Sequence, residues 1–387
     1  MLEGCDIICF SHDWDGDPLS KKHIMLGLAQ KNRILWVNSI GNRNPTVSGR
    51  DLKRIIKKLL EFLGGYRTVG HNMYAYTPIV IPFHGSTVAR WINRRLLRWS
   101  LRFVCRRLGF NQPITWTFAP SSSEVVGSLG ERLVVYHCVD EFSEFTGTNK
   151  ATILELERCL LEKADLVIVS SGPLYESKRC SNPKTFLVTH GVEVDHFRKA
   201  CDPETPVPED IGSLPRPVVG FFGLIADWVD IELIRFLAVS RPNWSLVLIG
   251  KSDTSLSRLQ GLANVHLLGR RDYRALPGYC KGFDVAILPF VVNTLTLAAN
   301  PLKLREYLAA GLPVVATPLP EVEKFEGLVS IGRSPEQFLE RIQALLDGGR
   351  TGSQLAISEA MDCESWDQKI EVMSQIVNNA LSGKRNN

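Results

Sequence analysis

Short apolar runs alternate with amphipathic stretches through the first half of the chain. Apolar runs at 6–10 and 33–38 flank a segment in which Ser20 can cap a helix over about 21–30. This order of strand, loop, helix and strand is typical of a parallel βαβ unit. Further apolar runs predict strands at 114–118, 133–138, 166–170 and 185–189, and an amphipathic run predicts a helix at 151–163. Residues 1–200 are therefore predicted to form a doubly wound α/β domain.

The pattern is interrupted between residues 201 and 217, where prolines and acidic residues crowd together. Proline disfavours both helix interiors and central strands, so this segment is predicted to be an interdomain linker. The alternation then resumes, with strands predicted at 218–222, 245–249, 265–268, 285–289 and 313–316 and helices at 231–240, 301–310 and 335–346. A second parallel α/β domain is expected over 218–365. Beyond it, 366–381 is predicted to be a helix and 382–387 a frayed tail.

Composition narrows the class of protein. The 387 residues are 44% hydrophobic and 22% charged, which suits two packed cores and excludes disorder over most of the chain. The net charge of +4 does not by itself indicate a nucleic-acid binder. Nine cysteines without a CxxC pair, and no N-terminal signal pattern, predict reduced cytosolic thiols. The chain lacks a run of about 18 clean apolar residues, so a soluble or peripheral protein is expected.

Residues 300–316 contain a helix followed by a buried strand. Asn300 is a good N-cap, Pro301 suits the first helical position, and Gly311 suits the left-handed residue after the helix. A helix N-terminus attracts anions, and Lys303 in the first turn would add a full charge. Glu306, one turn later, could accept hydrogen bonds from two ribose hydroxyls. The alternative is a capped helix whose Lys303 and Glu306 are merely solvated.

This segment, Asn300-Pro-Leu-Lys-Leu-Arg-Glu-Tyr-Leu-Ala-Ala-Gly-Leu-Pro-Val-Val-Ala316, resembles the C-terminal signature of GT-B glycosyltransferases, especially family four. In that family the glutamate before the A-x-G-x-P-V-V strand holds the ribose of a nucleotide-sugar. Residues 265–277, with Arg270 and Tyr273, resemble the family's nucleobase-lining segment, and 282–289 resembles the strand before its donor loop.

Three other segments extend the likeness. Residues 190–197 are similar to the run that closes the family's N-terminal domain, and 18–23 with 35–38 are similar to bacterial transferases of exopolysaccharide and teichuronic-acid assembly. The resemblance implies an α/β protein of the GT-B class, with two doubly wound Rossmann-like domains facing a central cleft. It also implies a metal-independent enzyme that needs no cofactor beyond its nucleotide-sugar substrate.

Within the expected donor site, the chain departs from the family pattern at two places. Ala298 stands where many members carry a glutamate that contacts the sugar, and 223–229 lacks the Arg and Lys that clamp the diphosphate. Diphosphate binding would then depend on the helix end from Asn300 to Lys303, with help from Lys251. Gly223 is also expected in the donor site.

Candidate catalytic residues lie in the first domain. Asp140 follows the strand at 133–138, where family four places a histidine near the reacting sugar. It could deprotonate an acceptor hydroxyl in an inverting enzyme, or orient the acceptor in a retaining one. The alternative is an aspartate that caps the next helix, and His137 is predicted to be a core residue.

The loop at 12–17 suggests a metal site at first sight. An EF-hand starting at Asp13 would need glycine and glutamate where Pro18 and Ile24 stand, so no metal is expected. The loop is predicted instead to contact the acceptor through His12, with Lys21 nearby and Asp13 as a second candidate base.

Residues 86–110 form a basic amphipathic segment in a stretch without acidic residues. Arg90, Arg94, Arg98 and Arg102 make one helical stripe, and apolar residues make another, namely Ile92, Leu96, Trp99 and Phe103. A second basic helix is expected around 50–58. Either the apolar stripe packs on the sheet and the arginines are solvated, or the segment docks on anionic lipid headgroups. Nucleic-acid binding lacks a recognised module.

Together these observations predict a hexosyl-type glycosyltransferase of bacterial surface or exopolysaccharide synthesis. It would take a UDP-, GDP- or dTDP-linked sugar and a saccharide or polyprenyl-linked acceptor, in the cytoplasm or on the inner face of the membrane. Two alternatives stay open: a nucleotide-sugar epimerase of the same architecture, and a noncatalytic sugar-nucleotide-binding scaffold. A P-loop, a G-x-S-x-G motif and a complete G-x-G-x-x-G are missing from the sequence, which disfavours kinases, hydrolases and dehydrogenases.

Overall fold

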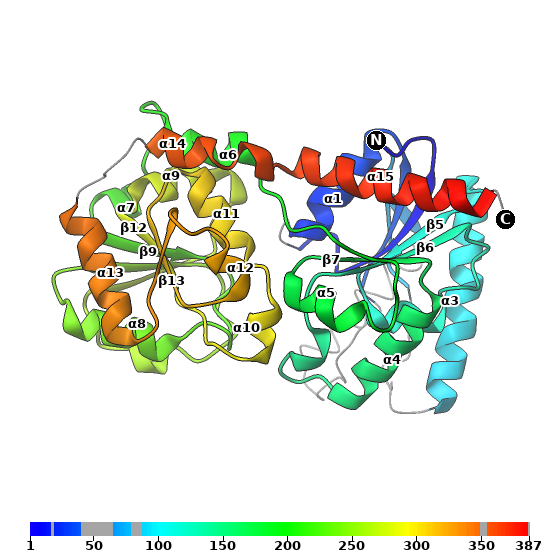
Figure 1. Cartoon of the computed structure of the whole chain (residues 1–387), viewed down its shortest axis with the longest axis horizontal. Helices are drawn as coiled ribbons and strands as arrows, with labels where there is room; N and C mark the ends of the chain where they lie inside the picture. The colour runs from blue at the N-terminus through cyan, green and yellow to red at the C-terminus, as the bar shows by residue number, and fades with distance from the viewer. Residues whose placement is uncertain (17–18, 40–64, 79–86, 349–353, 386–387) are drawn as a thin grey trace. The chain divides into compact units, whose positions relative to one another are not determined.

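The computed structural model describes residues 1–16, 19–39, 65–78, 87–348 and 354–385 (Figure 1). The chain divides into two compact units, one made of Met1–Thr189 with Lys369–Asn387 and the other of His190–Gln368. Each unit contains one largely parallel sheet whose strands are joined by helices. The predicted α/β fold with two Rossmann-like domains is therefore confirmed.

The sheet of the first unit has the strand order β3-β4-β2-β1-β5-β6-β7-β8, in which only the edge pair β3 and β4 is antiparallel. Its elements are β1 (Asp6–Phe10), α1 (Ser20–Ala29), β2 (Arg33–Val37), β3 (Tyr66–Gly70), β4 (Met73–Tyr76), α3 (Thr87–Leu108), β5 (Ile114–Thr117), η1 (Pro120–Glu124), β6 (Leu133–Cys138), η2 (Phe142–Glu144), α4 (Lys150–Lys163), β7 (Leu166–Val169), α5 (Gly172–Lys178) and β8 (Thr185–Leu187).

The central strands of this sheet are buried on both faces, and most of their residues are apolar. Every residue of β5, β6 and β7 is buried, and β1 and β2 are buried apart from their first residues. Continuous apolar runs of this kind are what parallel strands require. The hairpin of β3 and β4, which the sequence pattern did not predict, lies at the edge, where β3 keeps exposed residues.

The sheet of the second unit is wholly parallel, with the order β11-β10-β9-β12-β13-β14. Its elements are α6 (Val194–Arg198), η3 (Lys199–Cys201), α7 (Glu209–Gly212), β9 (Val218–Phe222), α8 (Ile231–Ser240), β10 (Ser245–Ile249), η4 (Ser257–Leu259), β11 (Val265–Gly269), η5 (Tyr273–Ala275), α9 (Leu276–Gly282), β12 (Val285–Leu288), α10 (Thr294–Ala298), α11 (Leu302–Ala309), β13 (Val314–Ala316), α12 (Pro320–Glu323), β14 (Val329–Ile331), α13 (Pro335–Asp347), α14 (Gln354–Glu359) and η6 (Asp362–Glu364).

Residues 201–217, predicted as a linker, lie inside the second unit. Ile211 of α7 is fully buried, and Arg271 donates a hydrogen bond to Asp210 at 2.8 Å. Tyr279 of α9 donates to the same carboxylate oxygen at 3.0 Å. Apart from the end of η3 and the short helix α7, residues 201–217 form no regular element, but the segment still packs into the unit. The boundary between the units falls earlier, at His190.

The helix α15 (Trp366–Arg385) begins in the second unit and continues as part of the first. Ile370, Met373 and Val377 are buried, and a Cβ on Gly27 of α1 would lie 2.4 Å from Cδ1 of Ile370. Glycine at position 27 therefore allows this close approach. The helix continues to Arg385, into the segment predicted to be a frayed tail, and Lys384 forms an ion pair with Asp165 at 2.6 Å.

One expected cap is shifted. Ser20 was predicted to cap α1 but is its first helical residue and is buried, while Leu19 holds the N-cap position.

Candidate functional site

The carboxyl ends of β9 and β10 are unusually close to each other in the second unit. Gly250 has φ +151°, and a Cβ there would lie 1.8 Å from the carbonyl oxygen of Gly223, so only glycine fits. Gly223 in turn has φ +146° and donates its N–H to the Ile249 carbonyl at 2.8 Å. A Cβ on Gly223 would lie 3.1 Å from Cε of Lys303. Gly250 thus allows the close approach of the Gly223 backbone, and Gly223 leaves room for the Lys303 side chain at the carboxyl end of β9.

Lys303 and Glu306 form an ion pair in the first turns of α11, with Nζ and Oε2 2.9 Å apart. Nζ of Lys303 also lies 5.1 Å from the centroid of the Phe222 ring. The Glu306 side chain is only 3% exposed, and burial raises its pKa although the Lys303 charge opposes this. A buried carboxylate and an ammonium therefore stand together at a helix N-terminus, where free N–H groups add positive potential.

Tyr273 and Glu193 extend this cluster. The Tyr273 hydroxyl donates to Oε2 of Glu193 at 2.6 Å, and His196 stacks on the Tyr273 ring with centroids 4.6 Å apart. Burial raises the pKa of Tyr273, and the charges of Glu306 and Glu193 raise it further. Tyr273 therefore stays a neutral phenol beside two carboxylates.

Glu193 was not predicted as a site residue. The run 190–197 was noted in the sequence, but only as the end of the N-terminal domain. In the structure it belongs to the second unit, where α6 packs against α11. The sequence pattern alone does not show that this run packs against α11, so Glu193 was missed.

Asn300 does not occupy the predicted N-cap position, because α11 begins at Leu302 with Pro301 as its N-cap residue. The Asn300 side chain is buried, accepts a hydrogen bond from Arg305 and donates to Glu321 at 3.4 Å. Arg305 is buried as well and pairs with Glu364 at 2.9 Å. The buried guanidinium has drawn the asparagine into a polar cluster behind the helix end, so the capping prediction was wrong.

The remaining predicted donor residues are more exposed. Lys251 follows β10 and forms an ion pair with Asp253, and Arg270 follows β11 with its side chain exposed. Both lie after the carboxyl ends of adjacent strands in the same sheet as β9.

In the first unit, Asp140 and Lys21 come together at the end of β6. Nζ of Lys21 lies 5.3 Å from the ring centroid of Phe142 and 5.8 Å from that of Phe118. Burial raises the pKa of the half-buried Asp140 to about 6, and the Lys21 charge opposes the rise. Burial likewise lowers the pKa of Lys21, with Asp140 opposing. The two charges stabilise each other, yet within the described ranges they form no direct ion pair.

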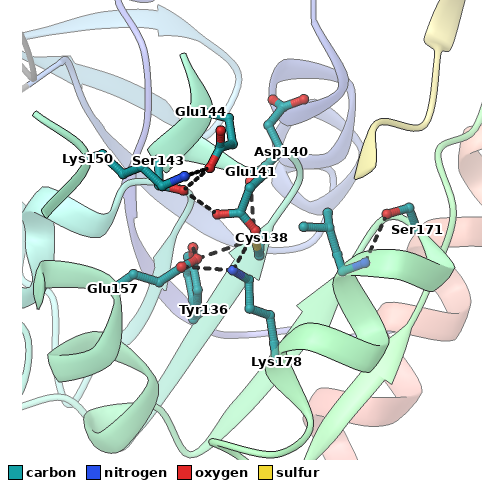
Figure 2. A network of polar contacts seen from close by, with 11 residues as sticks. Tyr136, Cys138, Asp140, Glu141, Ser143, Glu144, Lys150, Glu157, Ser171 and Lys178 are labelled. Carbon is teal, nitrogen blue, oxygen red and sulfur yellow. Dashed lines mark hydrogen bonds and ion pairs between the residues drawn. The ribbon is translucent and has the colours of Figure 1, made fainter. Parts of the chain in front are cut away.

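A buried polar network holds the turn that carries Asp140 (Figure 2). Lys178 of α5 reaches Oε2 of Glu157 at 2.8 Å and Oε2 of Glu141 at 2.9 Å. The Tyr136 hydroxyl donates to the other oxygen of Glu157 at 2.6 Å. The Asp140 carboxylate points away from these contacts (Figure 2). The side chain of Glu141 therefore holds the turn through its ion pair with Lys178, whereas the Asp140 side chain takes no part in this network.

Other candidates of the first unit are engaged in the local structure. His12 has Nδ1 3.1 Å from Oγ of Ser11 and its ring 5.3 Å from that of Trp36. Asp13 accepts a hydrogen bond from the Ser39 amide at 3.2 Å. Asp13 thus ties its loop to the end of β2. Across the residues that the structure describes, no group of three His, Cys, Asp or Glu could hold a metal ion.

His137 is fully buried, as predicted for a core residue. Its ring lies 4.9 Å from that of Phe118 and 6.1 Å from that of Trp116. Burial lowers its pKa to about 3, so the imidazole is neutral.

The basic helix α3 does not pack on the sheet through the apolar stripe that was predicted to do so. Its buried apolar residues are Leu97, Leu101 and Val104, whereas Trp99 and Phe103 of the predicted packing stripe are exposed. Arg94, Arg98 and Arg102 are exposed too. The Arg90 side chain and the second basic segment at 50–58 lie outside the described residues. No helix in the described ranges is long and apolar enough to cross a bilayer.

Residues 216–348 match the family model of Glycosyl transferases group 1. Over 212 residues the chain is 29% identical to TuaH from Bacillus subtilis (strain 168), whose name assigns it to teichuronic acid biosynthesis as a glycosyltransferase. This match covers 50% of this chain and 52% of TuaH, so the chain spans about half the length of the curated relative.

Solved structures are similar over nearly the whole chain. Sucrose-phosphate synthase from Thermosynechococcus elongatus has a TM-score of 0.68 at 18% identity, covering 98% of this chain and 100% of its own. HepE from Anabaena in complex with UDP-glucose has a TM-score of 0.64 at 16% identity, covering 98% and 99%. At such identities the likeness establishes the fold alone. The predicted resemblance to GT-B glycosyltransferases is confirmed, and membership of family four stays a prediction.

Proposed function

We propose that this GT-B chain, with its group 1 glycosyltransferase domain, transfers a sugar from a nucleotide-sugar to a saccharide or polyprenyl-linked acceptor. The observation that carries the proposal is the buried Glu306 paired with Lys303 at the start of α11, beside Gly223 at the end of β9. The name of the relative TuaH supports a role in bacterial surface polymer synthesis.

The donor would bind at the Lys303–Glu306 cluster. The Glu306 carboxylate would accept hydrogen bonds from the ribose hydroxyls, and Lys303 with the N-terminal N–H groups of α11 would neutralise the diphosphate. Protein cations and the helix dipole would take the place of a metal ion in stabilising the leaving group. Tyr273 would line the base side of the site. Because HepE was solved with UDP-glucose, a UDP-hexose is the first donor to test.

Asp140 would act on the acceptor. With a pKa of about 6 the carboxylate is ionised at neutral pH but remains basic enough to take a proton from a hydroxyl as it attacks. Lys21 would keep the carboxylate ionised. The acceptor class proposed here agrees with a peripheral location at the inner face of the membrane.

Ligand-induced thermal stabilisation tests the donor site. The melting temperature should rise with one family among UDP-, GDP-, ADP- and dTDP-sugars, since a ligand that binds only the native state stabilises it. Glu306→Gln and Lys303→Met should each weaken binding by roughly 10-fold or more, the value of a charge-assisted hydrogen bond. Glu232→Gln, which alters an exposed ion pair of the same unit, is the matched control. Unchanged affinity in both site variants would contradict the assignment.

A noncatalytic donor-binding scaffold is the second candidate, since the segment 223–229 offers no Arg or Lys to the diphosphate. Product analysis separates the two functions. Donor binding without transfer or hydrolysis, in the presence of extracted lipid-linked acceptors, would favour the scaffold. Conversion of the donor's sugar without any acceptor would indicate an epimerase.

A further inference from the structure

The outer face of α3 combines exposed aromatic side chains with arginines. Trp99 is 67% exposed, Trp91 and Phe103 are 50% exposed, and Leu96 is 42% exposed. At 3.6 residues per turn, Trp99 lies on the side of the helix opposite to the buried Leu97 and Leu101. Large apolar side chains thus lie on the side of α3 that faces away from the core. We call this face the α3 outer face and define it by the exposed residues Trp91, Arg94, Arg95, Leu96, Arg98, Trp99, Arg102, Phe103, Arg106 and Arg107.

The charge of this face is strongly positive. Six of its arginines are exposed, namely Arg94, Arg95, Arg98, Arg102, Arg106 and Arg107. The sequence has no acidic residue between Glu61 and Glu124, and none of these arginines has an acidic partner among the described residues. Within the part of the chain that the structure describes, the face is therefore a band of arginines without acidic partners around an aromatic centre.

The aromatic side chains and the arginines support one another. The guanidinium of Arg95 lies 4.3 Å from the Trp91 ring centroid, and that of Arg107 lies 5.8 Å from the Phe103 centroid. Trp99 and Phe103 stack with centroids 5.9 Å apart. Exposed apolar surface of this kind usually marks an interaction site.

We propose that the α3 outer face docks on an anionic lipid bilayer, with the helix lying in the plane of the interface. The aromatic rings and Leu96 would insert among the headgroups, and the arginines would contact lipid phosphates. A second copy of the chain fits poorly, because two such faces would place like charges against each other. A free polyanion would use the arginines, but it would not account for Leu96 and the three exposed rings.

This inference deepens the proposed transferase function, because a polyprenyl-linked acceptor lies in the same bilayer. Its test nevertheless requires no transfer activity. Failure to bind vesicles would overturn the docking inference but would leave the result of the donor-binding assay unchanged. Failure to bind donor would overturn the proposed donor site but would leave the vesicle result unchanged.

Vesicle co-sedimentation of the full chain tests the inference. Phosphatidylcholine vesicles containing phosphatidylglycerol should bind the protein, and vesicles of phosphatidylcholine alone should bind it much more weakly. Each of Arg94→Gln, Arg98→Gln and Arg102→Gln should lower the partition coefficient by about fivefold, the effect of one basic residue at the surface. Trp99→Ser with Phe103→Ser should lower it by roughly 10-fold at any salt concentration, because ring burial is not screened.

The same co-sedimentation assay provides matched controls and the results that would contradict the inference. Val239→Ser and Val372→Ser remove exposed apolar side chains elsewhere, at 57% and 45% exposure, and should leave partitioning unchanged. Equal binding to neutral and anionic vesicles would overturn the inference. Loss of self-association in the Trp99→Ser, Phe103→Ser variant, without any vesicle binding by the wild type, would identify a dimer face instead. Binding to heparin or single-stranded RNA but not to vesicles would identify a polyanion site.

Discussion

Two opposite charges at the end of β6, those of Asp140 and Lys21, illustrate how burial shifts the pKa of individual residues. Asp140 is half-buried just after the carboxyl end of β6, near the Lys21 ammonium, which itself lies over the Phe142 ring. Burial disfavours its ionised form, and Lys21 favours it, so the net pKa rises to about 6. A carboxyl group with a pKa of about 6 is mostly ionised at neutral pH, where it could accept the proton of a sugar hydroxyl.

The pH dependence of transfer should report this residue. If Asp140 is the base, kcat/KM should rise as pH increases through about 6, because only the ionised carboxylate accepts a proton. Lys21→Met removes the charge that lowers the Asp140 pKa, so the acid limb should move to higher pH. Asp140→Asn should lower kcat/KM by roughly 10²–10⁴-fold and abolish that limb.

Lys31→Met, which alters an exposed ion pair with Glu3, serves as the control and should leave the profile unchanged. An acid limb that survives in Asp140→Asn would assign the titration to another group.

At the scale of secondary-structure elements, one ammonium group joins α5, α4 and the turn after β6. The Lys178 side chain is 5% exposed and Glu157 is 4% exposed, so both charges have lost most of their hydration. Burial alone would lower the Lys178 pKa, but the neighbouring carboxylates raise it overall. The network therefore holds Glu141, and with it the backbone next to Asp140, in one position (Figure 2).

Lys178→Met should destabilise the protein strongly, because it leaves Glu157 and Glu141 without their cation. Removal of one partner from a buried pair costs about 3–5 kcal/mol in the free energy of unfolding. Urea denaturation measures this loss. Arg158→Met breaks an exposed pair on the same helix as Glu157 and should cost no more than about 0.5 kcal/mol. Equal effects of the two variants would show that burial does not decide the strength of these pairs.

At the scale of the whole molecule, the last helix closes the first unit. The α15 residues Ile370, Met373 and Val377 are buried, and Ile370 lies over Gly27 of α1. Polar contacts add to this packing, since the N-terminal amine pairs with Glu371 at 3.0 Å. A unit built from residues 1–189 therefore depends on residues that follow the second unit in the chain.

Ile370→Ala should destabilise the first unit by about 2–5 kcal/mol, because it leaves a cavity between α15 and α1. Hydrogen exchange of the α1 and β1 amides measures this local loss, while protection of β9 and β12 in the second unit should change less. Val372→Ala, at a 45% exposed position of the same helix, should stay within about 0.5 kcal/mol of the wild type. Equal loss in both variants would mean that Ile370 contributes no more than a surface residue.

Much of the fold could be predicted from the chain pattern, since burial on both faces of a parallel strand requires a continuous apolar run. The predicted strand at 133–138 matches β6, and the predicted helix at 301–310 contains α11. The edge hairpin of β3 and β4 was missed because its outer strand is partly exposed and lacks such a run.

The candidate site was predictable only in part. Glu306, Lys303 and Tyr273 do gather in one cluster, and they lie on local segments whose spacing or family likeness is visible in the sequence. Glu193 joins them only because α6 folds onto α11. Asn300 was assigned a wrong local role because a buried arginine five residues later competes for its side chain.

The sequence by itself determined the two α/β domains, the helix end with Lys303 and Glu306, and the concentration of arginines in α3. Tertiary structure alone decided where the units divide, which carboxylates meet Tyr273, and that the aromatic side chains of α3 point away from the core. The physical reason is that periodicity encodes which residues can be buried along one element, whereas packing between elements selects which face is actually covered.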